Sequence, residues 1–307
     1  MDALCLRSRG GPEALRHEDV PAPRPGPGEI LVRVKAAAVT PTELLWVPTW
    51  ATPAGEPRPF PIIPGHEFSG RIEEVGPSVA DLAAGDDVYG LNDWFRDGAQ
   101  AELCVARAID VARKPVSIDH VAAAATPISA LTAWQALFEH GRLAAGERVL
   151  VHGAAGGVGL FAIQLARSHR AHVIVTASAH NHDFVRELGA HEAIDYRTER
   201  FEDVLGATID LVVDTVGDDT LERSWSVLAP RGRLVTIATS AETATDPRVK
   251  DAFFIVEPRR DELERIADEI DSGELRVVVG AAFPFIDALA AYRHKPRHGK
   301  VVLEISA

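Results

Sequence analysis

Cysteine is scarce in this chain, with only Cys5 and Cys104 among 307 residues. Both lie in apolar, strand-like runs, which excludes a disulfide framework and favours a reducing, cytoplasmic setting. Positive charge is also in deficit, because 32 Lys and Arg face 45 Asp and Glu, for a formal net charge of −13. Such a chain repels phosphate backbones and anionic lipid surfaces, so we expect no nucleic-acid or membrane partner.

Long apolar runs are missing too. No run approaches the roughly 20 residues that cross a bilayer, and no basic-then-apolar leader with a small-residue cleavage site opens the chain. We therefore expect neither a membrane span nor a secretory signal. No Ser/His/Asp set or carboxylate pair indicates hydrolysis. The hydrophobic content of 46% and charged content of 25% are those of a globular protein, and the length favours two domains.

The most informative feature that is present is a glycine-rich turn within residues 148–159. A β-branched run, Val149 to Val151, meets Gly153, Gly156 and Gly159, and a helix-like segment follows. This spacing lets a chain turn off a strand and begin a helix whose bare N–H groups and positive dipole end suit a pyrophosphate. The turn predicts a dinucleotide ligand.

A glycine pattern alone is weak evidence for a dinucleotide site, so the secondary structure predicted around it decides whether the assignment holds. Extended and helical segments alternate after it. The predicted strands are His172–Ser178, Glu192–Arg197, Ile209–Gly217 and Arg233–Ser240, and the predicted helices are Asp183–Leu188, Phe201–Leu205 and Thr220–Leu228. This alternation predicts a doubly wound parallel sheet.

The flanking regions have a different texture. Residues 1–118 contain short strands between Pro and Gly turns, which is typical of a small β-barrel-like unit, whereas Ile118 to Gly146 reads as helical. Past the sheet we predict a strand at Asp251–Glu257, a helix at Asp261–Ile270 and a β-rich return. That return comprises Leu275–Phe283, Ile286–His294 and Lys300–Ile305. The expected domains are 1–118, an inserted 119–258, and 259–307, which completes the first.

Several short motifs occur in a specific order across nearly the whole chain. They are Pro64-Gly65-His66-Glu67-Phe68-Ser69-Gly70, Val75-Gly76-Pro77, Gly85-Asp86-Asp87-Val88-Tyr89-Gly90, Ala130-Leu131-Thr132-Ala133-Trp134, the His152–Gly159 turn, Leu188-Gly189-Ala190, Ile194-Asp195-Tyr196 and Gly299-Lys300-Val301-Val302-Leu303. With them the chain resembles the medium-chain dehydrogenase/reductase superfamily, in its zinc-free quinone-oxidoreductase (zeta-crystallin-like) branch. The resemblance implies an α/β protein: a GroES-like β-barrel catalytic domain, an inserted doubly wound Rossmann domain that binds NAD(P), and an active-site cleft between them.

We expect no metal. Zinc-dependent members of the superfamily hold zinc through Cys, His and a third Cys, Asp or Glu, and the position matching the first Cys is Thr40 here. Threonine is a poor zinc ligand beside a thiolate. His66 and Glu67 match the zinc family's Gly-His-Glu, but two residues do not make a three-ligand site. We interpret Cys104 as a buried small hydrophobe.

Without zinc, hydride is better delivered to a carbon whose new charge delocalises. A quinone gives a phenolate and an α,β-unsaturated carbonyl gives an enolate, and hydroxyl or amide donors can stabilise either. The candidate catalytic residues are Thr40, Thr42 and His66. The family's Asn-Pro-x-Asp stretch reads Thr40-Pro41-Thr42-Glu43 here, and the proton donor stays open between His66, a threonine relay and bound water.

The cofactor expected is NADPH. NAD-preferring folds place an acidic residue about 20 positions after the glycines, on the ribose hydroxyl. Here that strand ends in Ser178, His180 and Asn181, and no carboxylate appears before Asp183. These side chains can donate to a 2′-phosphate, and Tyr196 matches the tyrosine that flanks it in this branch, with Arg197 beside it.

Within the glycine-rich turn, the predicted pyrophosphate contacts are Ala155, Gly156, Gly157 and Val158. Matched positions supply the other predicted cofactor contacts, although each could equally be sheet core. They are Thr132, Thr215, Val216, Gly217, Ala238, Thr239, Phe254 and Val256. The predicted substrate pocket is aromatic, from Trp46, Trp50 and Trp94 with Phe60 and Phe95.

The predicted function is NADPH-dependent, zinc-free reduction of a quinone or an α,β-unsaturated carbonyl. Two alternatives are an enoyl reductase of a biosynthetic pathway and a cofactor-binding protein without turnover. The cysteine content favours the cytoplasm, and the resemblance implies a homodimer that associates through an exposed edge strand near Phe253–Val256.

Overall fold

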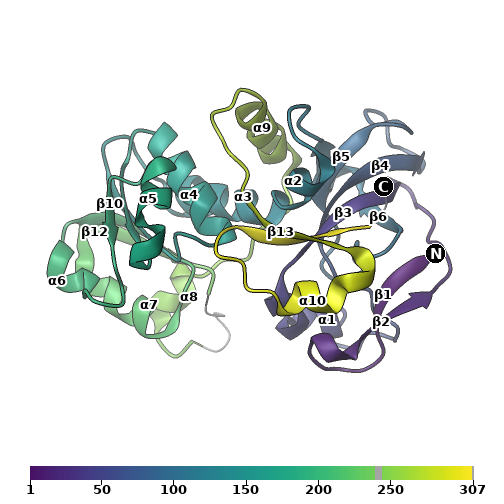
Figure 1. Cartoon of the computed structure of the whole chain (residues 1–307), viewed down its shortest axis with the longest axis horizontal. Helices are drawn as coiled ribbons and strands as arrows, with labels where there is room; N and C mark the ends of the chain where they lie inside the picture. Colours follow the sequence, from purple (N-terminus) through teal and green to yellow (C-terminus); the bar gives the residue numbers. More distant parts are fainter. Residues whose placement is uncertain (239–243, 306–307) are drawn as a thin grey trace. The chain divides into compact units, whose positions relative to one another are not determined.

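A computed structural model describes residues 1–238 and 244–305 of the chain (Figure 1). The chain forms two units, each built on a sheet of its own. The first comprises residues 1–128, 258–272 and 277–307, and the second comprises residues 129–257 and 273–276. Residues 119–128, which we expected in the inserted domain, lie with the first unit because helix α2 (His120–Ala124) packs on that unit's sheet.

The first unit is built around a seven-stranded sheet whose central strand is β3 (Glu29–Val39). The strand order is β13-β14-β3-β4-β5-β7, and β6 also pairs with β3. The other bounds are β4 Glu67–Val75, β5 Asp87–Leu91, β6 Leu103–Arg107, β7 Val111–Arg113, β13 Val279–Pro284 and β14 Lys300–Glu304. A hairpin of β1 (Asp2–Leu6) and β2 (Leu15–Asp19) forms a separate two-stranded sheet. Strands from both ends of the chain, β1 and β14, belong to this unit (Figure 1).

Hydrophobic side chains cover both faces of β3. Ile30, Val32 and Val34 pack with Phe68 and Ile72 in one core cluster, and Val39 lies in another. The helices of the unit besides α2 are α1 (Val47–Trp50), α9 (Arg260–Asp271) and α10 (Ala288–Arg293), while α3 (Pro127–Trp134) spans the boundary between the units.

The second unit contains a five-stranded parallel sheet in the order β10-β9-β8-β11-β12. Its strands are β8 Arg148–His152, β9 His172–Thr176, β10 Glu192–Ile194, β11 Ile209–Asp214 and β12 Leu228–Thr236. The helices are α4 Gly157–Ser168, α5 His182–Glu187, α6 Phe201–Leu205, α7 Asp218–Ser224 and α8 Pro247–Ala252. The strand order reverses between β8 and β11, and in open α/β sheets ligands bind at the carboxyl ends of strands at such a point.

Two sequence predictions of secondary structure are wrong. Asp251–Glu257 is not a strand, because α8 runs through Ala252 and Phe253 makes only a single parallel bridge with Thr236. Asp246 caps this helix by accepting from the Arg248 N–H, and Pro247 occupies its first turn, which is a start signal we missed. The expected dimer edge at Phe253–Val256 is therefore not an edge strand.

The second wrong prediction is the β-rich reading of Ile286–His294, which contains α10. Its sequence, Ala-Leu-Ala-Ala-Tyr-Arg, is rich in strong helix formers, and these outweigh the surrounding β texture. Among the described residues, no helix combines the length and the apolar character needed to cross a bilayer.

Candidate functional site

Strand register in the first unit brings three polar residues together. β14 runs antiparallel to β3 with Val301 opposite Val39, so the next residue on each strand, Lys300 and Thr40, face one another. β4 pairs with the other side of β3 and begins at Glu67. Three segments that are distant in the sequence thus meet at one end of β3.

These three residues form a buried charged network. The Lys300 ammonium donates to Thr40 Oγ1 at 2.7 Å and forms an ion pair with Glu67. Thr40 Oγ1 lies 3.4 Å from Glu67 Oε1, and Glu67 Oε2 accepts from the Ile128 N–H at 3.0 Å. The Glu67 side chain is 1% exposed and that of Lys300 is 12% exposed. Lys300 donates to the Thr40 oxygen, and the Thr40 hydroxyl itself donates to Glu67 Oε1 over 3.4 Å, which is long for an O–H···O hydrogen bond.

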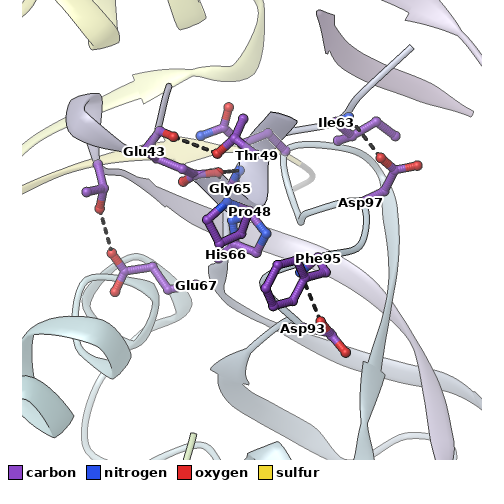
Figure 2. Close-up of polar contacts among 12 residues, drawn as sticks. Glu43, Pro48, Thr49, Ile63, Gly65, His66, Glu67, Asp93, Phe95 and Asp97 are labelled. Atoms are coloured by element: carbon purple, nitrogen blue, oxygen red, sulfur yellow. Dashed lines mark hydrogen bonds and ion pairs between the residues drawn. The ribbon is translucent and has the colours of Figure 1, made fainter. Parts of the chain in front are cut away.

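A second buried pair is formed by Glu43 and His66 (Figure 2). Glu43 Oε1 lies 2.8 Å from His66 Nδ1 and accepts from the Gly65 N–H at 2.7 Å. The side chains are 1% and 2% exposed. With Glu43 as the acceptor of this pair, Nδ1 is the donor and Nε2 is the ring atom that is left to exchange a proton. Among the described residues, His66 Nε2 has no hydrogen-bond partner.

Aromatic rings lie beside His66. The Trp94 ring is 5.2 Å from the His66 ring, and Trp46 meets Trp94 edge-on at 5.6 Å. Both tryptophans are half-buried. Trp50, in contrast, belongs to the hydrophobic core: its ring is buried with Leu44 and its Nε1–H donates to the Leu44 carbonyl. Our prediction of Trp50 as a pocket wall does not agree with this placement.

The remaining predicted residues of this unit lie closer to solvent. Thr42 is exposed, as is Phe60, while Phe95 is half-buried. The structure therefore brings Thr40 and His66 into buried polar pairs, but not Thr42. Sequence reasoning missed two partners, Lys300 and Glu43. Glu43 was visible only as a departure from the family pattern, and Lys300 only as part of a common strand motif.

In the second unit, the glycine-rich turn has the predicted form. Gly153 follows β8 with φ +72°, and an added Cβ there would lie 2.2 Å from Thr215 Oγ1. Gly156 is the N-cap of α4, a helix of 12 residues. The first turn of a helix presents N–H groups that lack intrahelical partners, so the backbone at Gly157 and Val158 can hold an anion. Ala155 to Val158 are partly or fully exposed.

The turn after β11 is fixed by a buried carboxylate. Asp214 accepts from the Val216 and Gly217 N–H groups at 3.1 Å each and from the Thr236 hydroxyl at 2.8 Å. Burial raises the pKa of Asp214, against the effect of these donors. Thr215 in turn donates to the His152 carbonyl at 2.8 Å. The β8 and β11 turns are thereby joined at the switch point of the sheet, where the dinucleotide is expected.

The side chains predicted to meet a 2′-phosphate follow β9 and β10, which are neighbouring strands. Ser178 and Asn181 are buried, with Asn181 Nδ2 3.4 Å from Ser178 Oγ, while His180 is exposed and its Nε2 lies 3.3 Å from Ser178 Oγ. Tyr196 is exposed, and the Arg197 guanidinium lies over its ring at 5.7 Å.

The other predicted cofactor positions are mixed. Thr132 is buried in α3, and Phe254 is buried and stacked on His140 at 4.3 Å, so its contribution is limited to backbone groups. Val256 is buried next to Glu257, whose backbone exchanges two hydrogen bonds with the Gln135 amide. Ala238 is exposed, and Thr239 lies outside the described residues.

Comparison with known proteins gives the family. The alcohol dehydrogenase GroES-like domain matches residues 26–116, and the zinc-binding dehydrogenase domain matches residues 188–303. The chain is 32% identical to a probable zinc-binding oxidoreductase, mitochondrial, of Arthroderma benhamiae, over 95% of this chain and 92% of that protein. It is 30% identical to a 2-haloacrylate reductase of Burkholderia sp, over 95% and 94%.

Solved structures agree with this assignment. The quinone oxidoreductase from Coxiella burnetii has a TM-score of 0.88 at 27% identity and covers 100% of this chain and 99% of its own. A mycobacterial protein in complex with NADPH has a TM-score of 0.81 at 30% identity and covers 99% and 100%.

These likenesses define an oxidoreductase that uses a nicotinamide cofactor. The chain belongs to the medium-chain dehydrogenase/reductase superfamily, in its quinone-oxidoreductase branch. The predicted fold class, a GroES-like domain with a Rossmann domain, is confirmed.

Two of these names include zinc, so the residues available to bind a metal bear on the reaction. The described residues contain no group of three or more His, Cys, Asp or Glu side chains placed to hold a metal. His66 Nε2 is available, but Thr40 accepts from the Lys300 ammonium, and a cation at that oxygen would repel a metal dication. Glu67 is paired with Lys300 and Glu43 with His66. The residues present therefore do not fit a catalytic zinc.

Proposed function

We propose that the protein reduces quinones or α,β-unsaturated carbonyl compounds with NADPH and without a metal. The observation that carries this proposal is the Thr40–Lys300 contact. This contact orients the Thr40 hydroxyl beside an ammonium group, and the resemblance matches Thr40 to the metal-binding cysteine of zinc-dependent relatives.

The chemistry follows from the donors available. Reduction of an isolated ketone concentrates charge on one oxygen, which zinc stabilises as a Lewis acid. When hydride adds to the β-carbon of an enone or to a quinone, the charge spreads over an enolate or phenolate. Hydroxyl donors can then suffice, and each is worth several kcal/mol in a dry site. Thr40 is such a donor when a substrate oxygen replaces Glu67 Oε1 as the acceptor of its hydroxyl hydrogen, and Thr42 offers an exposed second hydroxyl.

The substrate class has two further supports. Trp46 and Trp94 present an aromatic surface beside His66, which suits a flat conjugated substrate. The relatives' names point the same way, since 2-haloacrylate reductase and quinone oxidoreductase both name substrates in which a carbonyl is conjugated to a double bond.

When bound, NADPH supplies the hydride. We propose that the α4 N-terminus at Ala155–Val158 holds the pyrophosphate, and that Ser178, His180 and Asn181, with Tyr196, receive the 2′-phosphate. This loop carries no carboxylate before Asp183, so a phosphate dianion meets no direct repulsion there. Thr132, Thr215, Val216, Ala238 and the backbone at Phe254 and Val256 complete the proposed contacts. We further propose that the protein is cytoplasmic, because it has few cysteines, and that it forms a homodimer, because members of the family often do.

The test is oxidation of NADPH by the purified protein with 1,2-naphthoquinone and with 2-cyclohexenone. We expect turnover with at least one acceptor, and tighter binding of NADPH than of NADH in calorimetry. Thr40→Val should lower kcat by about 10²-fold, as the loss of one oxyanion donor does, while Thr40→Ser keeps the hydroxyl and most of the rate. Tight NADPH binding with no turnover of either acceptor would instead identify a cofactor-binding protein.

A further inference from the structure

The proposed function leaves the source of the proton unassigned. Hydride addition produces an anion, and this anion must be neutralised before the product leaves. The first unit contains one buried polar atom beside the aromatic surface that has no partner among the described residues, His66 Nε2. A buried ring nitrogen without a hydrogen-bond partner destabilises the folded protein, so its retention calls for an explanation.

The surroundings of His66 hold its ring in one orientation. Glu43 Oε1 accepts at 2.8 Å from Nδ1 and is itself fixed by the Gly65 N–H at 2.7 Å (Figure 2). The Glu43 carbonyl also accepts from the Thr49 hydroxyl at 2.6 Å, which anchors this residue's backbone. Because both side chains are buried, the pair is desolvated and its geometry is set by packing and not by solvent.

We propose that Glu43 and His66 form the proton-donating pair of the reaction, with His66 as the catalytic acid and Glu43 as the residue that positions it. This assignment rests on the reductase function proposed above. A fixed carboxylate–imidazole pair is the arrangement that keeps one ring nitrogen protonated and aims the other at a reacting atom. In zinc-dependent relatives the matching histidine is a metal ligand; here Nε2 is left to act on the substrate.

Hydride brings two electrons to the β-carbon of the enone, and the π electrons of the double bond move toward the carbonyl oxygen. The Nε2–H bond breaks and an O–H bond forms, giving the enol, which becomes the ketone in water; a quinone gives the hydroquinone in the same way. Imidazole is left neutral, with Nδ1–H still donated to Glu43, and water restores the Nε2 proton after product leaves.

Trp94 has a defined place in this proposal. Its half-buried ring lies 5.2 Å from the His66 ring and meets the Trp46 ring edge-on at 5.6 Å. A carbonyl oxygen that accepts the proton must come within hydrogen-bond distance of Nε2, and so must lie beside this ring. The substrate therefore enters as a flat group against Trp94, which selects conjugated rings over bulky saturated ones.

The experiment compares His66→Gln, Glu43→Gln and the double variant with the wild-type protein, using the acceptor that the wild type reduces. Each single change should lower kcat by about 10²-fold or more, with little change in KM, because proton donation acts in the transition state. The double variant should be no slower than the slower single variant, because the two residues act as one unit. Glu43→Asp keeps the carboxylate and should restore part of the rate.

A matched control is His120→Gln, which alters another partly buried histidine of the same unit, 2.8 Å from Ser69 Oγ, and should leave kcat unchanged. Calorimetric NADPH binding by each variant checks that the protein is folded. If His66→Gln does not fold, the test is the comparison of kcat between Glu43→Gln and Glu43→Asp. The amide oxygen of Glu43→Gln can still accept from the Gly65 N–H, so we expect this variant to fold.

The outcomes separate the two proposals. A wild-type protein that oxidises NADPH with neither acceptor overturns the reductase function, and the pair with it. An active wild type whose His66→Gln and Glu43→Gln variants turn over at the same rate overturns the pair alone. Rate losses that multiply in the double variant would mean two independent structural effects, which also contradicts the assignment.

Discussion

Replacing Lys300 by Met tests the charged network at the end of β3. The change keeps most of the side-chain volume but removes the ammonium that donates to Thr40 and pairs with Glu67. Glu67 would then be a carboxylate that is 1% exposed, with the Ile128 N–H as its closest remaining donor. Removing one partner of a buried ion pair costs about 3 to 5 kcal/mol, because the other charge stays desolvated.

The assay is urea unfolding monitored by tryptophan fluorescence, to which Trp46, Trp50 and Trp94 of the first unit contribute. We expect Lys300→Met to lower the free energy of unfolding by about 3 to 5 kcal/mol. Adding Glu67→Gln removes the stranded charge and keeps an oxygen for the Ile128 N–H, so the double variant should recover more than half of this loss. A single variant as stable as the wild type, or a double variant less stable than the single, would refute the reasoning.

Three further predictions concern the second unit. Burial lowers the pKa of His152 to about 3, so below about pH 6.5 the unfolded chain takes up a proton that the folded chain does not. We therefore expect the free energy of unfolding to reach its full value above that pH and to be about 2 kcal/mol lower at pH 5. Urea unfolding at the two pH values measures this loss, which His152→Gln should abolish. Gly153→Ala combines a positive φ with a 2.2 Å clash and should abolish NADPH binding in calorimetry. Gly146→Ala has a positive φ but open space around the new Cβ, and should cost only about 1 kcal/mol in the free energy of unfolding. Equal effects of the two variants would contradict the turn geometry. His180→Glu should weaken NADPH binding by roughly tenfold and leave NADH binding unchanged. The control Val204→Glu adds the same charge to α6 and should alter the binding of neither cofactor. Unchanged NADPH affinity in His180→Glu would contradict the proposed contact between His180 and the 2′-phosphate.

Much of the second unit could be predicted from its sequence, because each strand there is a short apolar run that meets a turn residue. The glycine spacing fixed β8 and α4 closely, since strand, turn and helix signals agree over residues 148–168. The strand predicted at Asp251–Glu257 is wrong because apolar Phe253 and Phe254 outweighed the Asp246-Pro247 helix start signal in our interpretation.

The polar partners of the candidate site could not be predicted in the same way. Lys300 and Thr40 are separated by 260 positions, and only the antiparallel register of β14 with β3 makes them neighbours. Glu43 is three residues from Thr40 in the sequence, yet its role depends on the fold bringing Gly65 and His66 to it. Trp50 is an apolar side chain like Trp46, and nothing in its local sequence says which of the two enters the core.

The most direct test of the central claim, reduction without a metal, is to measure NADPH oxidation and bound zinc on the same preparation. Elemental analysis gives the zinc content, and turnover with the accepted quinone or enone is recorded before and after chelation and after zinc is added back. We predict turnover that is independent of zinc at every stage. Activity that rises in proportion to bound zinc, up to one zinc per chain, would contradict the account.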